Sequence, residues 1–139
     1  MSDHKKDDSQ KTKEHLREVL ELDKETDYCK EDAMIFDNMG VIYSEMGDLE
    51  EAMKYHQKAL KIFRELDHRE GEAITLNNIG LIYQTKGDLE NALKYLKDAL
   101  NIIDKYKFTY GRDVIQNEIN SIMNDLEENW KNSKMYEQR

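Results

Sequence analysis

The same stretch of sequence occurs twice in this chain, forty residues apart. The segment "MGVIYSEMGDLEEAMKYHQKALKIF" returns as "IGLIYQTKGDLENALKYLKDALNII", and fifteen of the thirty residues from Ala33 to Ile62 are identical to their partners forty residues on. An internal repeat constrains the fold more than composition does, because each copy must form the same structural unit and the copies must stack on one another.

Each copy predicts two amphipathic helices and no strand. In the first copy, apolar and small residues recur at helical spacing on two successive faces. The first face comprises Phe36, Met39, Gly40 and Tyr43, and the second comprises Ala52, His56, Ala59, Leu60 and Phe63. The chain has no proline and six glycines, so the usual punctuation of sheets and long loops is missing. We therefore predict an all-α fold.

The motif GDLE joins the two helices of each copy. Gly47 is expected to end the first helix in the left-handed conformation, and Asp48 to accept free backbone N–H groups of the second. Glu51 is expected to close a capping box with the same turn. In the second copy Asn91 replaces this glutamate, which predicts a slightly weaker cap.

These residues resemble the tetratricopeptide repeat family. The family pattern is an aromatic residue, a Leu-Gly pair, a tyrosine, an alanine and a second aromatic residue. It reads here as Phe36, Met39-Gly40, Tyr43, Ala52 and His56, and again as Leu76, Ile79-Gly80, Tyr83, Ala92 and Leu96. His56 falls where the family normally buries a large side chain, so the resemblance implies that His56 is a packed, hydrogen-bonded residue. The period is forty residues instead of the thirty-four of the family. This variant looks like the repeats of kinesin light chains, Pins/LGN-type polarity adaptors and bacterial Rap-type regulators.

The resemblance implies a right-handed superhelical solenoid of about six antiparallel helices. We expect them near 12–25, 30–46, 49–65, 70–86, 89–106 and 110–130. In domain terms, we expect residues 1–10 to form a mobile polar N-terminus and residues 11–130 a single domain. That domain comprises a half repeat (11–29), two repeats (30–69 and 70–109) and a closing helix (110–130), followed by a tail (131–139).

Several classes of function are disfavoured by the residues. The net charge of −9 argues against nucleic acid, and no apolar run approaches the roughly 20 residues of a membrane span. We therefore expect a cytoplasmic protein. The single cysteine, Cys29, cannot form an internal disulfide. No histidine stands in a metal-binding spacing, and no nucleophile or phosphate-binding motif occurs. We predict no enzyme activity, no metal and no cofactor.

In tetratricopeptide arrays the first helix of each pair lines a concave groove, so the resemblance implies a groove of apolar, amide and acidic side chains. The expected groove residues are Met34, Asp37, Asn38, Val41, Glu45, Ile74, Asn77, Asn78, Leu81, Gln84 and Asn117. No Lys or Arg occurs in 31–46, 72–85 or 114–129. The cationic clamp with which chaperone-docking members hold acidic tails therefore cannot form here.

The leading hypothesis is a protein-interaction module, an adaptor or scaffold that binds a peptide or a helix of a partner. The ligand should be neutral, apolar or cationic. The asparagines resemble those with which the forty-residue subfamily bonds a peptide backbone, an amide being both donor and acceptor. Alternatively, they only satisfy neighbouring helices. Two other functions stay open: a self-associating structural solenoid and a sensor subunit of a Rap-type signalling system.

Trp130 continues the buried stripe of the closing helix, four residues past Leu126. We expect it to cap the solenoid by folding onto Ile103 and Leu126, because helical periodicity reaches it without a break. The alternative is that Trp130 docks against another molecule, which includes a weak homodimer built on the C-terminal end.

Overall fold

The computed structural model describes residues 9–14, 28–109 and 111–137, and within these ranges the chain is helical with no strand. The helices are α2 (Lys30–Glu45), α3 (Leu49–Glu65), α4 (Arg69–Thr85), α5 (Leu89–Tyr106) and α6 (Arg112–Glu137). Residues 9–14 are also helical. The expected all-α fold is confirmed. The half-repeat helix predicted near 12–25 falls mainly outside the described residues, as does most of the polar segment 1–10.

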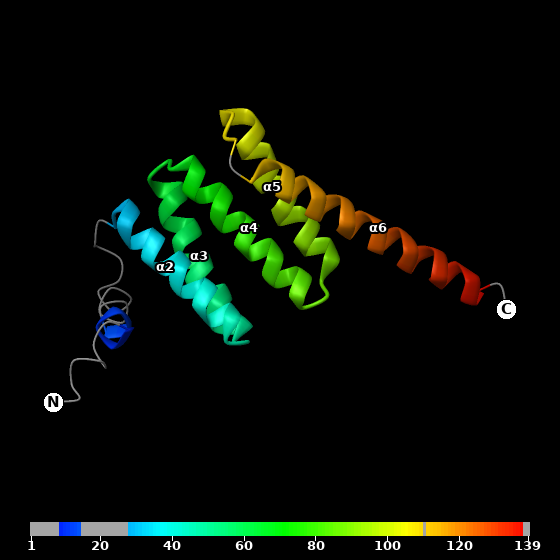
Figure 1. Ribbon diagram of the computed structural model, residues 1–139, viewed down its shortest axis with the longest axis horizontal. Coiled ribbons are helices and arrows are strands. Elements are labelled where there is room, and N and C mark those ends of the chain that lie inside the picture. The colour runs from blue at the N-terminus through cyan, green and yellow to red at the C-terminus, as the bar shows by residue number, and fades with distance from the viewer. Residues whose placement is uncertain (1–8, 15–27, 110, 138–139) are drawn as a thin grey trace.

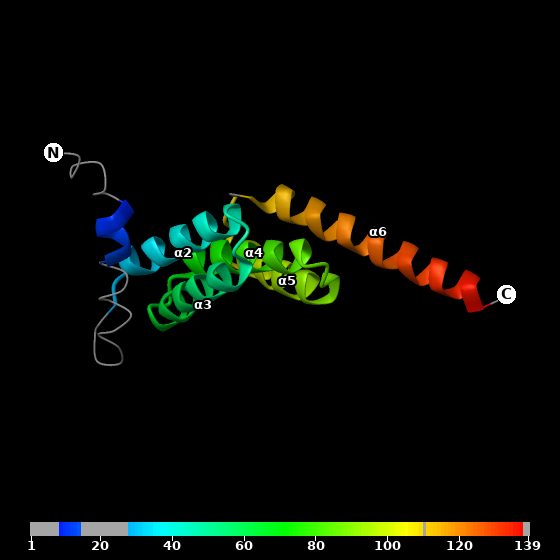
Figure 2. The ribbon, with the colours of Figure 1, turned by 90° about the horizontal axis from the view of Figure 1, so that it is seen from below.

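The helices stack in the order of the sequence. Helix α2 packs against α3, α3 against α4, α4 against α5 and α5 against α6, while α2 also touches α4. Figure 2 shows α2, α4 and α6 along one side of the stack and α3 and α5 along the other. This is an all-α solenoid, in which each element contacts mainly its neighbours.

The three turns that join α2 to α5 have the same backbone structure. In the first, the N–H of Asp48 donates to the carbonyl of Tyr43 (2.9 Å), and the equivalent bonds close the next two turns at His68 and Asp88 (both 2.9 Å). Gly47 has φ +84°, which confirms its predicted left-handed conformation. Helices α3, α4 and α5 begin at residues 49, 69 and 89. The forty-residue period therefore consists of two units of equal length.

The predicted N-cap of α3 is confirmed, but the capping box is wrong. The Asp48 side chain accepts the backbone N–H of Glu51 (3.2 Å). The N–H of Asp48, which a box glutamate would accept, is already bonded to Tyr43. The Glu51 carboxylate instead pairs with Lys54 (2.9 Å). Because the turn already satisfies this donor, a glutamate at the third helical position has no box to close.

Tyrosines recur as structural pairs, one in each repeat. The rings of Tyr43 and Tyr55 stack with centroids 5.3 Å apart, and those of Tyr83 and Tyr95 stack at 5.4 Å. All four are partly buried, and burial raises the pKa of the Tyr83 hydroxyl above its ordinary value. Each pair joins the two helices of one repeat, so these four tyrosines have a structural role.

The closing helix is longer than predicted and leaves the body of the solenoid. Its buried residues, Ile115, Ile119 and Ile122, all lie in its first half. The second half runs beyond the other helices (Figures 1 and 2). Trp130 is 62% exposed, so the predicted cap on Ile103 and Leu126 is wrong. The predicted helix end at 130 is also wrong, because no glycine or proline follows to stop the helix before Glu137.

Candidate functional site

Two hollows lie side by side on the face formed by α2, α4 and α6. The first hollow has a volume of about 340 Å³ and lies between α2 and α4. The second hollow, of about 300 Å³, lies between α4 and the start of α6, with the end of α5 as its floor. Ile74 and Glu70 line both hollows. The two hollows therefore adjoin along one edge of α4.

The two hollows are the same site in successive repeats. Apart from Glu70, whose partner at 110 is not described, every lining residue of the first hollow has a partner forty positions on that lines the second. The pairs are Lys30 and Glu70, Met34 and Ile74, Asp37 and Asn77, Asn38 and Asn78, Phe63 and Ile103, His68 and Phe108, Gly71 and Gly111, and Ile74 and Val114. The repeat thus duplicates a surface as well as a fold.

The chemistry of the two hollows differs. Where the first hollow has a lysine at position 30, the second has the carboxylate of Glu70. The imidazole of His68 is replaced by the ring of Phe108, and the carboxylate of Asp37 by the amide of Asn77. The second hollow is therefore the more apolar of the two. It has the negative charge of Glu70 where the first hollow has the positive charge of Lys30.

The carboxylate of Asp37 is occupied by neighbouring side chains. Its Oδ1 lies 2.6 Å from Nδ1 of His56, and its Oδ2 accepts a hydrogen bond from Nδ2 of Asn78 (3.1 Å). Asp37 is 7% exposed and His56 1% exposed. The prediction of a packed, hydrogen-bonded His56 is confirmed. The Asp37 carboxylate thus links α2 to α3 and α4, while its contact with a ligand stays a prediction.

The asparagines on this face divide into two kinds. Asn78 donates to Asp37 and so satisfies a neighbouring helix. The side-chain amides of Asn38, Asn77 and Asn117 form no hydrogen bond within the part of the chain that the structure describes. Of these three, Asn38 lines the first hollow and Asn77 the second, whereas Asn117 lies exposed on α6 outside both. Within the two hollows, Asn38 and Asn77 are therefore the amides available to a ligand.

The apolar residues predicted for this face are all exposed to a similar degree. Met34 is 49% exposed, Ile74 39%, Val41 37% and Leu81 37%. Met34 and Ile74 line the hollows, but Val41 and Leu81 lie farther along α2 and α4. Three polar residues of the predicted set also lie outside the hollows, namely Glu45, Gln84 and Asn117. The structure thus gathers about half of the predicted residues around the hollows.

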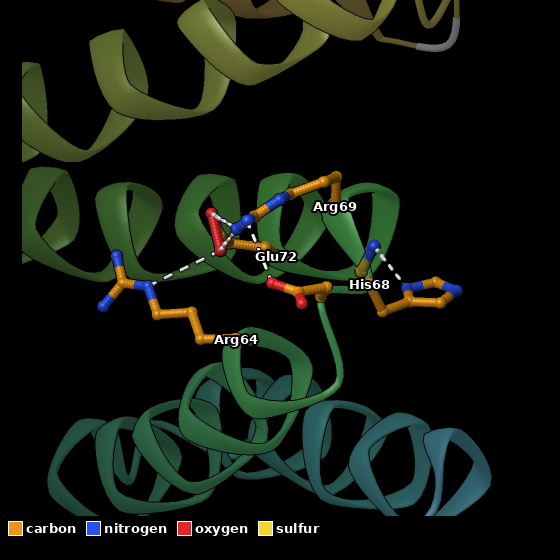
Figure 3. A network of polar contacts seen from close by, with 6 residues as sticks. Arg64, His68, Arg69 and Glu72 are labelled. Carbon is orange, nitrogen blue, oxygen red and sulfur yellow. Dashed lines mark hydrogen bonds and ion pairs between the residues drawn. The ribbon is translucent and has the colours of Figure 1, made fainter.

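A polar network fixes the turn that forms the edge of the first hollow. Glu72, which is buried, accepts from Arg69 (3.2 Å) and lies 3.6 Å from Arg64 of α3. Nδ1 of His68 accepts the N–H of Gly71 (3.0 Å) and so caps α4. Figure 3 shows these contacts around the turn. Because α3 and α4 are tied here, the His68 ring has a defined position in the hollow.

The sequence analysis did not predict several of the lining residues, among them Lys30, His68, Glu70 and Phe108. They lie at the first turn of a helix or in the segment between two helices, whereas the predicted groove residues all lie in helix interiors. A signal was present in the sequence, because Lys30 and Glu70 are forty residues apart, as are His68 and Phe108. The repeat could have paired them, but periodicity does not show which paired positions are exposed.

Other kinds of site are not indicated in the described ranges. No group of three or more His, Cys, Asp or Glu side chains there could hold a metal ion. No helix among 9–14, 28–109 and 111–137 is long and apolar enough to cross a bilayer. The two hollows are therefore the candidate functional site.

Comparison with known proteins identifies the repeat. A family model described as tetratricopeptide repeat matches residues 2–65 and, in a second overlapping placement, residues 31–105. No curated protein matches the chain.

Proposed function

Because the chain belongs to the tetratricopeptide repeat family, we propose that it is a non-catalytic interaction module that binds a peptide or a helix of a partner protein. Repeats of this family generally mediate protein–protein interaction. The forty-residue period is consistent with the variant that resembles kinesin light chains. The binding surface would be the face of α2, α4 and α6 that carries the two hollows.

The observation that carries this proposal is the pairing of exposed apolar side chains with unbonded amides in both hollows. Met34 and Asn38 lie in the first hollow, and Ile74 and Asn77 in the second. Covering apolar surface is favourable by about 25 cal/mol per Å². An amide offers one donor and one acceptor to a peptide unit. A ligand that runs across α2 and α4 would find one apolar side chain and one amide in each hollow, although Asn38 and Asn77 occupy adjacent rather than equivalent positions of the repeat.

The charges of this face favour a neutral, apolar or cationic partner. Residues 31–46, 72–85 and 114–129 contain no Lys or Arg, so most of α2, α4 and α6 is free of cations. Among the described residues that line the two hollows, Lys30 is the one lysine, and there is no arginine. Since only two hollows contribute, we expect micromolar binding, at about −8 kcal/mol or weaker. Cytoplasmic location and the absence of a cofactor remain predictions.

A random dodecapeptide library, displayed on phage and panned on the immobilised protein, tests the proposal. A synthetic peptide of the selected sequence is then titrated by calorimetry into the parent and into Asn77→Ala. Losing one hydrogen bond of about 0.5–1.5 kcal/mol should weaken binding by roughly three- to tenfold. The matched control is Asn101→Ala, on the exposed surface of α5. Equal binding by both variants, or failure to select any peptide, would contradict the proposal.

Self-association through α6 is a second candidate, favoured by the exposed apolar residues of its second half. Trp130 is 62% exposed, Met135 65% and Tyr136 75%. Large apolar side chains gathered at one exposed end are typical of interaction surfaces. Light scattering gives the mass directly. Under this candidate the mass at high micromolar protein should be twice 16.5 kDa, and tryptophan emission should move to the red on dilution. A monomeric mass with constant emission would exclude it.

A further inference from the structure

Glu70 occupies a position on this face that no other carboxylate shares. It lines both hollows, so it stands where the first hollow ends and the second begins. It lies in the first turn of α4 and is exposed. We propose that Glu70 is the specificity-determining residue of this face and binds a Lys or Arg side chain of the partner, between two apolar side chains that enter the hollows.

This inference rests on the proposed function and adds the chemistry of the ligand. Two nearby carboxylates are already paired, Asp37 with His56 and Glu72 with Arg69. The Glu70 side chain, in contrast, forms no hydrogen bond or ion pair within 9–14, 28–109 and 111–137. Arg69, its neighbour in sequence, directs its guanidinium to Asp67 (3.0 Å) and Glu72 (3.2 Å). Among the described residues, the Glu70 carboxylate is therefore left without an ion-pair partner.

The repeat sets the spacing of the ligand's anchors. Met34 of α2, Ile74 of α4 and Val114 of α6 are forty residues apart and line the successive walls of the hollows. Directly packed helices lie about 8–10 Å apart, but α2, α4 and α6 pack mainly on α3 and α5 rather than on one another, so the two hollows should be separated by at least that distance. A matching ligand carries two apolar side chains at least about 10 Å apart, with its cation in between.

The first repeat has a positive charge, that of Lys30, at the position equivalent to Glu70. This charge restricts where the cationic side chain of the ligand can bind. Lys30 lines the first hollow at the place that Glu70 takes in the second. A cationic side chain placed beside Lys30 would be repelled, whereas one placed beside Glu70 would be attracted. The order of the two charges across the face therefore gives the ligand one preferred direction.

The chain offers a matched control for Glu70. Glu90 is the second residue of α5, as Glu70 is the second residue of α4, and both are exposed. Each carboxylate has the same position relative to the dipole of its helix, so substitution should perturb both helices alike. Only Glu70 lines a hollow.

The test begins with peptides selected by the parent from the random dodecapeptide library. A consensus peptide and its counterpart with the central Lys or Arg replaced by Glu are titrated into the parent, Glu70→Lys and Glu90→Lys. We expect Glu70→Lys to weaken binding of the consensus peptide by roughly tenfold and to improve binding of the counterpart. Glu90→Lys should leave both affinities within about twofold of the parent, as expected for an exposed charge outside the interface.

The outcomes separate the inference from the function on which it rests. Selected peptides that bind but show no Lys or Arg between apolar residues would overturn the role of Glu70 and leave the proposed function standing. Equal effects of Glu70→Lys and Glu90→Lys would do the same. If no peptide binds the parent, both proposals fail. Circular dichroism checks folding, and Glu70→Gln with Glu90→Gln replaces the lysine pair if either lysine variant is unfolded.

Discussion

The imidazole ring of His56 fills the space that a side chain on Gly40 would need. A Cβ built on Gly40 would lie 2.5 Å from Cε1 of His56, closer than two such atoms can approach. At the equivalent crossing of the second repeat, a Cβ on Gly80 would lie 2.9 Å from Cγ of Leu96. The glycine of each repeat thus sets how closely its two helices pack.

Replacing either glycine by leucine should destabilise the solenoid. Overpacking a filled crossing costs about 1–3 kcal/mol or more, and the loss is passed to the neighbouring repeat. We expect Gly40→Leu and Gly80→Leu each to lower the unfolding free energy by at least about 2 kcal/mol in denaturant titrations.

The same repeat position on α6 provides the control. Asn120 is exposed, and its Oδ1 accepts a hydrogen bond from Nε2 of Gln116 (3.1 Å) on the surface of the same helix. Asn120→Leu should therefore be tolerated, with a change within about 0.5 kcal/mol. If Gly40→Leu unfolds at the same denaturant concentration as the parent, the assignment of the close crossing is wrong.

Asp37→Ala should destabilise the junction of α2, α3 and α4. The substitution leaves His56 and Asn78 without their shared acceptor, and a buried polar group that loses its partner costs about 1–3 kcal/mol. Asn38→Ala changes the adjacent exposed residue and should be nearly neutral in the same denaturant experiment. Similar stabilities of the two variants would show that the Asp37 network contributes little.

Thr75→Val should leave the protein as stable as the parent or more stable. The hydroxyl of Thr75 is fully buried and has no hydrogen-bond partner among the described residues, so its removal should gain about 1 kcal/mol. The control is Thr85→Val, because the Thr85 hydroxyl is exposed and donates to the carbonyl of Leu81 (2.9 Å). A lower melting temperature for Thr75→Val would indicate an unseen partner of that hydroxyl.

The two halves of α6 should differ in their contribution to stability. Trp130→Ala removes an exposed ring and should change the unfolding free energy by less than about 0.5 kcal/mol. Ile122→Ala removes a fully buried side chain and should cost about 2–5 kcal/mol. Thermal melts of the two variants compare them directly. A large loss of unfolding free energy for Trp130→Ala in the monomer would instead support an intramolecular cap formed by Trp130.

Much of the fold was predictable because local chemistry repeats with the sequence. The paired copies placed α3 and α5 at their observed bounds, and Gly47 and Asp48 showed where one helix ends and the next begins. The turn at Asp67 and His68 was harder to recognise. Asp67 adopts φ +53° without being glycine, and His68 caps α4 with its ring. Neither residue type is typical of its role, so only the structure shows that this turn matches the other two.

The candidate site was predicted only in part because tertiary pairing decides which polar groups remain free. Asp37 lies 19 residues from His56 and 41 from Asn78, and no local pattern joins such distant residues. The second repeat has Asn77 and Leu96 at the positions of Asp37 and His56. This joint departure from the repeat is consistent with a contact, but a single sequence does not separate it from coincidence.

The most direct measurement of the central claim is a peptide titration followed by amide chemical shifts in NMR, which a 16.5 kDa protein allows. Addition of the selected peptide should shift the resonances of residues lining the two hollows, above all Met34, Asn38, Glu70, Ile74 and Asn77. Resonances of the outer surfaces of α3 and α5 should stay unchanged. Shifts centred instead on Trp130 to Tyr136, with none in the hollows, would contradict binding across α2 and α4.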